Sequence, residues 1–353
     1  MAINLHDRYA KQIQTAFTSE SLIAGRLSTE YSFSGVRTVK ISTPQTVPMN
    51  DYRRSGTNRY GDPVEMQDTV QELTLTQDKS FSLTVDKGNN ADQNGTKAAG
   101  KMLALQLKEQ AIPAMDKYIF GALAHKAGKI IGSSTALSKT NICDRISDGT
   151  LYMDDNEVPQ ENRTLFISNA AYKFLKQSGT DLNNESVNQK AWVKGQVAEY
   201  DNMRVIKVPS GRMPANVNFM IVYKNSATAP VKLSETKLHQ DPPGLSGNLM
   251  EGREYYDCFV FGVKSAGVYV DVDTASGKGK ITATPSIAAE TGAITCTDSS
   301  ATIVYTIDGT DPRYSSTAKT GAAAGTGKGV VVKAYAYEDG NFPSEVTTTT
   351  LTA

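Results

Sequence analysis

Alternating apolar and polar positions predict a pair of strands in the first quarter of the chain. The alternation covers Val36 to Ile41 and then residues 73–85, where Leu73, Leu75, Phe81, Leu83 and Val85 recur. A period of two is typical of a strand with one covered face. Residues 44–68 between them are rich in Pro, Gly, Asn, Asp and Arg, which favours a loop. We therefore predict a long two-stranded ribbon with a basic, flexible tip. Because such a ribbon is marginal alone, we expect a neighbouring subunit to cover it.

Apolar positions spaced by three or four residues predict helices. Residues 7–30 form an amphipathic pattern that Asp7 could cap, with Tyr9, Ile13 and Phe17 on one face. This stripe needs another surface to cover it. The longest helix is predicted at 97–127, with an apolar stripe of Met102, Leu105, Ile112, Met115, Ile119 and Leu123. Pro113 should kink or divide it, and Gly128 should stop it. A further helix is predicted at about 139–148.

The middle of the chain has mixed α/β character. Residues 163–168 form a continuous apolar run that predicts a buried strand, and Ser168 can cap the helix that follows. Strands are also predicted at 203–209 and 218–224. Two more, joined by a turn at residues 265–267, predict a closing hairpin.

The composition changes after Asp273. Residues 274–280 are a Gly/Ser/Lys linker, and residues 281–353 are rich in Thr, Ala, Gly and Val. Short strands are predicted at 294–295, 301–307 and 330–337. Their spacing predicts a small β-sandwich as a second domain.

The order of these elements resembles the Hong Kong 97-type capsid fold of tailed bacteriophages. The stretches GVRTVKI (35–41), DYRRSGTNRYGDPVEMQD (51–68) and TLTQDKSFSLTVDKGN (74–89) are similar to such coat proteins, and REYYDCFVFGVKSAGVYV (253–270) resembles their final hairpin. The resemblance implies an α+β capsid domain at 1–273. Its parts would be an N-arm (1–35), an extended loop (36–90), a spine helix (97–128), an axial domain (about 150–235) and a closing peripheral hairpin (250–273).

The resemblance also implies function and partners. A major capsid protein assembles as hexamers and pentamers into an icosahedral shell around double-stranded DNA, with a scaffolding protein and a portal as partners. The virion would then be its location, after assembly in the bacterial cytoplasm. Because Met1 lies close to the first predicted helix, we expect the scaffold to be a separate protein.

The C-terminal domain resembles the small immunoglobulin-like module at the C-terminus of chitobiase and hexosaminidase-type enzymes. The matching positions are Tyr305, Asp308, Gly309, Asp311, Pro312 and Ser315–Ser316. The resemblance implies an accessory module, which we expect to project outward and which could bind host-surface glycans. Tyr305, Tyr335 and Tyr337 could stack on sugars, although half-buried strand tyrosines are the commoner case. The sequence Asp308-Gly-Thr-Asp311 favours a turn over a calcium site.

A basic, aromatic cluster lies at the predicted ribbon tip, formed by Tyr52, Arg53, Arg54, Arg59 and Tyr60. A solvated loop and a contact between subunits are both consistent with these residues. Arginine pairs well with carboxylates of a neighbour, and the capsid resemblance favours the contact.

Charge and chemistry nominate no active site. Lys+Arg and Asp+Glu both number 37, which argues against a dedicated nucleic-acid-binding domain. Three cysteines and three histidines are dispersed, without metal-ligand spacing. We therefore predict no enzyme, cofactor or metal site. The absence of a signal peptide and of a long apolar run predicts folding in a cytoplasm, without a membrane.

Two alternatives remain open at this stage. An encapsulin-like compartment would share the fold but package enzymes. A secreted carbohydrate-binding protein could be argued from the C-terminal domain alone, although the missing signal peptide opposes it.

Overall fold

The computed structural model describes residues 20–31, 33, 36–44, 46–66, 68–92, 98–178, 199–325 and 327–352. The predicted N-arm stripe of Tyr9, Ile13 and Phe17 lies outside these residues. Residues 20–30, which the same helix prediction included, form turns and extended segments, so the prediction is wrong there. Gly25 has a φ of +72°, which breaks a right-handed helix. The backbone N–H of Leu22 is bonded to the Asp116 carboxylate and not within a helix.

The long helix consists of two α-helices with a π-helical turn between them. They are α2 (Ala99–Gln106), the turn η1 (Leu107–Ala111) and α3 (Ile112–His125). Pro113 stands at the start of α3 and has no N–H to donate, so the predicted division at this residue is confirmed. Helix α3 buries Ile119, Phe120 and Leu123, whereas α2 buries no residue. We call α2, η1 and α3 together the spine helix.

The predicted ribbon exists, but it is shorter than expected. Strand β1 (Thr38–Pro44) pairs antiparallel with β2 (Asp68–Thr74). The prediction that residues 73–85 form one strand is wrong, because the chain changes sheets at Leu75–Thr76. There the Asp257 carboxylate accepts hydrogen bonds from the backbone N–H and the hydroxyl of Thr76, at 2.8 and 2.7 Å.

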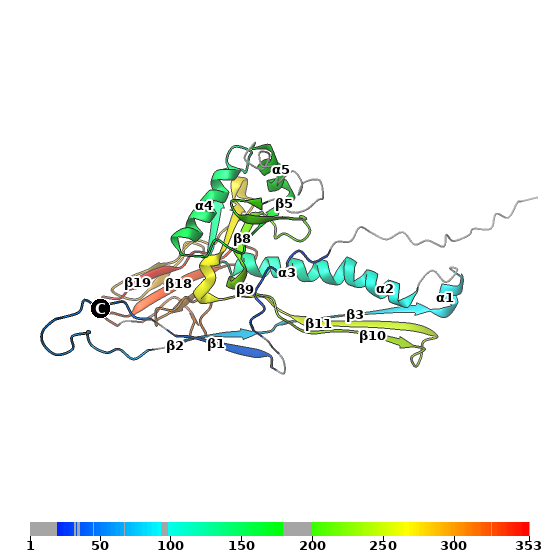
Figure 1. The fold of residues 1–353 in the computed structure, drawn as a ribbon, viewed down its shortest axis with the longest axis horizontal. Coiled ribbons are helices and arrows are strands. Elements are labelled where there is room, and N and C mark those ends of the chain that lie inside the picture. Colours follow the sequence, from blue (N-terminus) through cyan, green and yellow to red (C-terminus); the bar gives the residue numbers. More distant parts are fainter. Residues whose placement is uncertain are drawn as a thin grey trace, which may run out of the picture.

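Beyond that point the chain enters a three-stranded antiparallel sheet. Strand β3 (Gln77–Asp86) pairs with β11 (Gly247–Tyr256), which pairs with β10 (Val231–Gln240). This sheet runs beside the spine helix, and the short helix α1 (Lys87–Asp92) follows its first strand (Figure 1).

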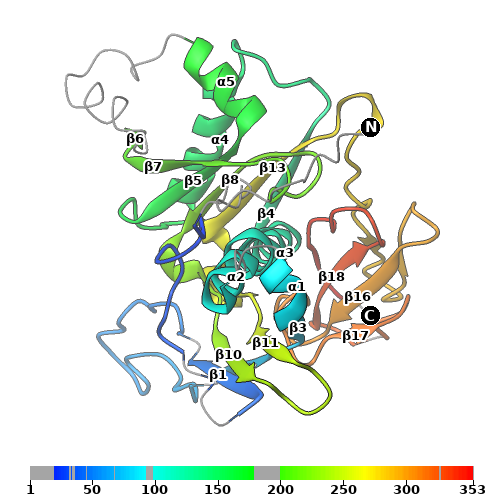
Figure 2. The same cartoon turned by 90° about the vertical axis from the view of Figure 1, so that its right-hand side faces the viewer.

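A six-stranded sheet forms the centre of the body. Its order is β4 (Lys129–Ser133), β13 (Val268–Asp273), β8 (Val217–Tyr223), β5 (Arg163–Ser168), β7 (Met203–Val208) and β6 (Glu199–Tyr200). One face packs on α3 through Phe120 and Phe166, whose ring centroids are 5.2 Å apart. The other face packs on α4 (Ile142–Asp155) and α5 (Asn169–Gln177). Figure 2 shows the sheet between these helix layers. The predicted strands 163–168, 203–209 and 218–224 are confirmed, as is the Ser168 cap, which accepts from Ala171 N–H at 3.2 Å.

The closing hairpin predicted at 250–273 is wrong. Among the described residues, strand β11 pairs with β3 and β10 and not with β13, which lies between β4 and β8. The connection contains β12 (Phe259–Val260), which pairs with β9 (Ala227–Thr228), and the 3-10 segment η4 (Gly262–Gly267). Another short 3-10 turn, η3 (Lys224–Ser226), precedes β9. Five successive buried residues in β13 are typical of a central strand, not of a hairpin arm with one solvated face.

The C-terminal module, residues 281–352, contains two small sheets. A two-stranded sheet joins β14 (Ser286–Ile287) to β15 (Ile294–Thr295). A four-stranded sheet has the order β17 (Lys319–Thr320), β16 (Thr302–Thr306), β18 (Val331–Tyr337) and β19 (Thr347–Thr350). Ile294 of one sheet and Val332 and Ala334 of the other share an apolar cluster. The strands predicted at 294–295, 301–307 and 330–337 are confirmed.

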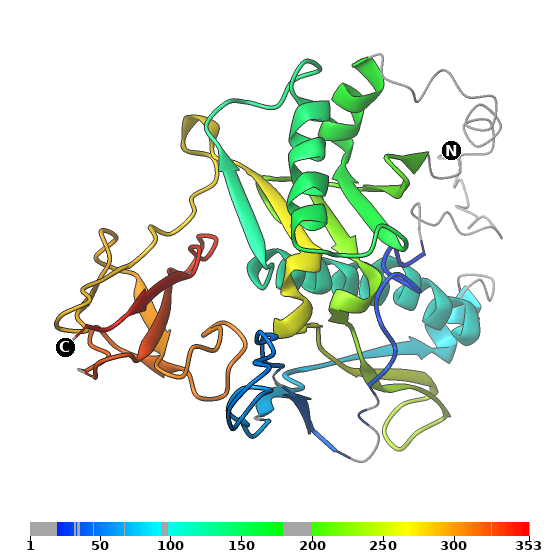
Figure 3. The ribbon, with the colours of Figure 1, turned by 60° about the vertical axis from the view of Figure 1, so that its left-hand side comes forward.

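The predicted linker is a folded connection. It contains the 3-10 segment η5 (Ala275–Gly277), and the Asp273 carboxylate accepts from Ala275 N–H at 3.0 Å. The side-chain amide of Asn216 donates to the carbonyl of Lys278 at 2.7 Å. The module therefore leaves the body in a fixed direction (Figure 3).

Candidate assembly surfaces

The ribbon tip, residues 46–66, presents its side chains to solvent. The rings of Tyr52 and Tyr60 meet edge to face at 5.0 Å, and Tyr60 remains 85% exposed. The backbone N–H of Arg53 donates to the carbonyl of Arg59 at 2.9 Å, and the Arg59 side chain donates to the carbonyl of Gly56 at 3.2 Å. The structure thus brings together four of the five predicted tip residues; Arg54 is exposed in the same loop.

The same tip exposes large apolar side chains that the sequence prediction did not single out. Met49 is fully exposed, and Val47, Val64 and Met66 are each more than 60% exposed. Exposed apolar side chains gathered on one segment are typical of an interaction surface. The tip therefore exposes apolar and aromatic side chains on the same segment as Arg53, Arg54 and Arg59.

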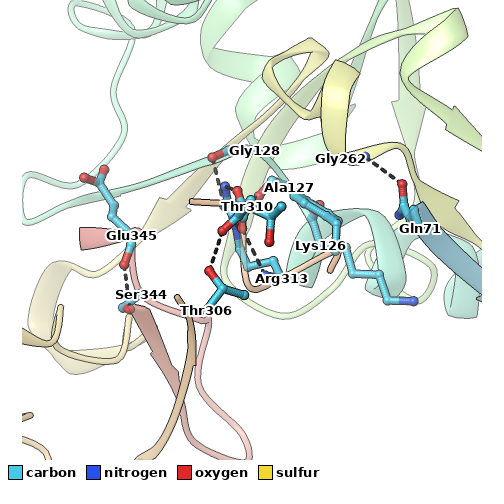
Figure 4. Close-up of polar contacts among 12 residues, drawn as sticks. Gln71, Lys126, Ala127, Gly128, Gly262, Thr306, Thr310, Arg313, Ser344 and Glu345 are labelled. Atoms are coloured by element: carbon cyan, nitrogen blue, oxygen red, sulfur yellow. Dashed lines mark hydrogen bonds and ion pairs between the residues drawn. The ribbon is translucent and has the colours of Figure 1, made fainter. Parts of the chain in front are cut away.

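The root of the ribbon is fixed to the body by Gln71 and an apolar cluster. The Gln71 side chain donates to the carbonyl of Val260 and accepts from Gly262 N–H, both at 2.9 Å (Figure 4). Leu73 and Leu75 are buried in a cluster completed by Phe33, Phe259 and Phe261. The tip therefore extends from a firmly held base.

The start of the described chain is pinned to the spine helix by a buried ion pair. The Asp116 carboxylate is 1% exposed and receives the Arg212 guanidinium at 2.7 Å. It also accepts from the Ser21 hydroxyl at 2.7 Å and from Leu22 N–H at 3.0 Å. Arg212 also donates to the carbonyl of Glu20 at 3.1 Å. These contacts fix residues 20–22 on the spine helix.

The turn motif of the C-terminal module forms as predicted. The Asp308 carboxylate accepts from Thr310 N–H at 3.0 Å, Gly309 has a φ of +73°, and the Thr306 hydroxyl donates to the carbonyl of Thr310 at 2.6 Å. Burial opposes ionisation of Asp308, but hydrogen bonds from Thr310 and Thr317 outweigh it and lower the pKa of this carboxyl. Tyr305, at the start of the motif, packs against the apolar cluster of the module.

Two residues after the turn dock the module on the body, and the sequence prediction missed both. The Arg313 guanidinium donates to the carbonyls of Ala127 and Gly128, at 2.9 and 3.0 Å, and is held by the Asp311 carboxylate at 2.7 Å (Figure 4). The hydroxyl of the half-buried Tyr314 donates to the carbonyl of Lys126 at 2.8 Å. Ala127 and Gly128 follow the C-cap of α3, and a cation near the negative end of a helix dipole is favourable. Asp311 therefore orients Arg313 in addition to forming the turn.

Apolar and ionic contacts complete this junction. Phe342 of the module is 6% exposed, belongs to the main core of the body and stacks on the His125 ring with centroids 5.1 Å apart. Glu345 forms an ion pair with Lys129. The module is thus docked against the end of α3.

A cleft of about 460 Å³ also opens at the junction. Tyr335 and Tyr337 lie on its module side, with ring centroids 6.1 Å apart and planes inclined by 29°. They alternate on β18 with the buried Val332, Ala334 and Ala336, so both point away from the module core. Burial raises the pKa of Tyr335 to about 12. Its phenol is therefore neutral at pH 7 and can donate a hydrogen bond.

Comparisons with known proteins support two separate likenesses. A family model described as Fn3 associated matches residues 293–351, within the module. No curated protein matches the chain in sequence. Among solved structures, a chain of Mycobacterium phage Che8 is similar with a TM-score of 0.64 at 18% identity, covering 78% of this chain and all of the other. The capsid structure of cyanophage P-SCSP1u has a TM-score of 0.62 at 12% identity, and the match covers 77% of this chain and 93% of the other. The mature capsid of bacteriophage PhiM1 has a TM-score of 0.60 at 11% identity, and the match covers 77% of this chain and 92% of the other.

The fold is that of a phage capsid subunit. The predicted α+β capsid fold is therefore confirmed. Among the described residues, no helix is both long enough and apolar enough to cross a bilayer.

Proposed function

We propose that this chain is the major capsid protein of a tailed bacteriophage and assembles into an icosahedral shell around double-stranded DNA. The capsid fold supports this role, and the main observation behind the proposal is the exposed apolar surface of the ribbon tip. Met49, Tyr60 and Val64 are large apolar side chains left in solvent on an extended arm. A neighbouring copy of the subunit is the natural cover for such an arm, because symmetric assemblies are built from complementary surfaces of one chain.

The roles of the parts follow from this proposal. Residues 36–90 supply the extended loop, 97–128 the spine helix, and the lobe at about 150–235 the axial contacts within hexamers and pentamers. The N-arm (1–35) adds a further contact, through Tyr9, Ile13 and Phe17. A scaffolding protein and a portal complete the assembly, which takes place in the bacterial cytoplasm and ends in the virion. The role is structural, not enzymatic.

Electron microscopy of particles from cells that express this chain with its neighbouring reading frames tests the proposal. We expect closed icosahedral shells.

The double substitution Tyr52→Ser and Tyr60→Ser should leave a folded subunit that forms few or no shells, because it removes the aromatic pair of the tip. The matched control, Tyr337→Ser, removes an exposed tyrosine of the C-terminal module and should assemble normally. Wild-type shell yield from the tip variant would contradict the assigned contact, and soluble monomers of the wild type would contradict the shell itself. Shells filled with an enzyme in place of DNA would favour the encapsulin-like alternative.

We further propose that the module binds host-surface glycans in the cleft beside Tyr335 and Tyr337. Two outward-facing rings beside Asn341 and His125 offer stacking and hydrogen bonds to a hydroxylated ligand. A glycan array probed with the wild type and with Tyr337→Ala tests this. Binding that the substitution abolishes is expected, and binding by neither protein, or equally by both, would refute it.

A further inference from the structure

We infer that the C-terminal module is a brace that holds the root of the ribbon in a fixed direction relative to the spine helix. The observation is that one short segment of the module, residues 313–316, contacts both elements. Arg313 and Tyr314 bind the carbonyls at the end of α3, as described above. Two residues later, the Ser316 hydroxyl donates to the carbonyl of Val70 in β2, at 3.3 Å.

The ribbon is a part of the body that needs such support. Strands β1 and β2 form a sheet of only two strands, and a sheet of that kind has little stability of its own. The body holds β2 at its C-terminal half, where Gln71 and Leu73 are anchored. The N-terminal half of β2, from Asp68 to Val70, instead lines a cavity of about 570 Å³ shared with the module. On the described residues, Ser316 is the hydrogen-bond partner that the module supplies there.

The docking surface also fits closely. Gly262 lies against Tyr314, and a Cβ atom added to Gly262 would come within 2.9 Å of the Tyr314 Cβ. Gly262 also donates its N–H to Gln71 at the ribbon root. The same glycine therefore contacts both the ribbon and the brace. A side chain at this position has to displace the module, while the Gln71 contact is made through the backbone and can persist.

Hydrogen exchange of the soluble, unassembled full-length subunit tests the inference. Two variants loosen the docking from opposite sides: Gly262→Ala in the body and Arg313→Met in the module. Their matched controls are Gly211→Ala, which has no atom within 4 Å of the added Cβ, and Lys319→Met, which removes an exposed cation from the same module. We expect the amides of residues 68–74 to exchange about fivefold faster or more in both variants, the change that one lost hydrogen bond of average strength gives. The controls and the central strands β5 and β8 should exchange as in the wild type.

Three outcomes would overturn the brace. One is wild-type exchange in residues 68–74, whether or not the module has come loose. Another is faster exchange in all segments alike, which indicates loss of global stability. The third is the same acceleration in the two controls. The consequence for assembly rests on the proposed function, but the bracing does not. If the subunit never forms shells, yet β2 exchanges faster when Gly262 is substituted, the bracing role stands and the proposed capsid function is refuted.

Discussion

Removal of the Arg212 guanidinium should destabilise the subunit strongly, because it leaves a buried carboxylate without its cation. Asp116 and Arg212 are 1% and 9% exposed, and their atoms are 2.7 Å apart. Breaking a buried ion pair from one side typically costs about 3–5 kcal/mol. In Arg212→Met the Asp116 carboxylate keeps its bonds from Ser21 and Leu22, so we expect a loss near the lower end, about 3 kcal/mol.

Urea denaturation followed by circular dichroism measures this loss. Lys117→Met is the matched control: it removes a cation from an exposed position adjacent to Asp116 on α3, and it should cost less than about 0.5 kcal/mol. Adding Asp116→Asn to Arg212→Met removes the unpaired charge and should restore at least about 1 kcal/mol. The reasoning is refuted if Arg212→Met is as stable as Lys117→Met, or if the second substitution makes the protein weaker still.

Two further predictions concern buried groups of the body. Burial raises the pKa of the Cys258 thiol to about 12 from a usual 9.0. The folded protein should therefore lose stability as pH rises above about 9 and through 12, since only the unfolded chain ionises this thiol freely. Cys258→Ala should reduce that slope in denaturation curves recorded across this range, and an unchanged slope would contradict the assignment. Gly149→Ala should cost about 1–3 kcal/mol, because its Cβ would come within 2.7 Å of Ile221 Cδ1. Gly100→Ala, in open space on α2, should instead stabilise by about 0.5–1 kcal/mol, so equal effects in urea would disprove the packing argument.

Sequence patterns correctly predicted the strands whose apolar positions form a continuous run or a clear alternation. The continuous apolar run at 163–168 became β5 with the predicted bounds, and Ser168 caps the next helix. The alternation at Val39 and Ile41 likewise became a ribbon strand. These signals depend on neighbours in the sequence, which is why they could be interpreted without the structure.

The errors arose where distant segments decide the outcome. Strands that follow one another usually form a hairpin, yet β13 pairs with β4 and β8 because a wholly buried strand needs a neighbour on each side. The two-sheet division at Thr76 depends on Asp257, 181 residues away. The docking role of Arg313 left no signal in the sequence either. Asp311 and Pro312 predict only a turn, and the carbonyls that Arg313 binds lie 185 and 186 residues earlier in the chain. The intersubunit role of Tyr52, Arg53, Arg54, Arg59 and Tyr60 stays a prediction, as does that of the N-arm residues.

The position of β13 also sets when the subunit can fold during synthesis. This strand, residues 268–273, lies inside the six-stranded sheet, so β4 and β8 have no shared partner until residue 273 has left the ribosome. At about 5–20 residues per second, synthesis of the 69 residues from 274 to 342 takes roughly 3–14 s more. Arg313 and Phe342 lie in this stretch, so the end of α3 gains these contacts only after all strands of the central sheet have been synthesised. A nascent chain can thus complete its central sheet before the C-terminal module is able to dock on the body.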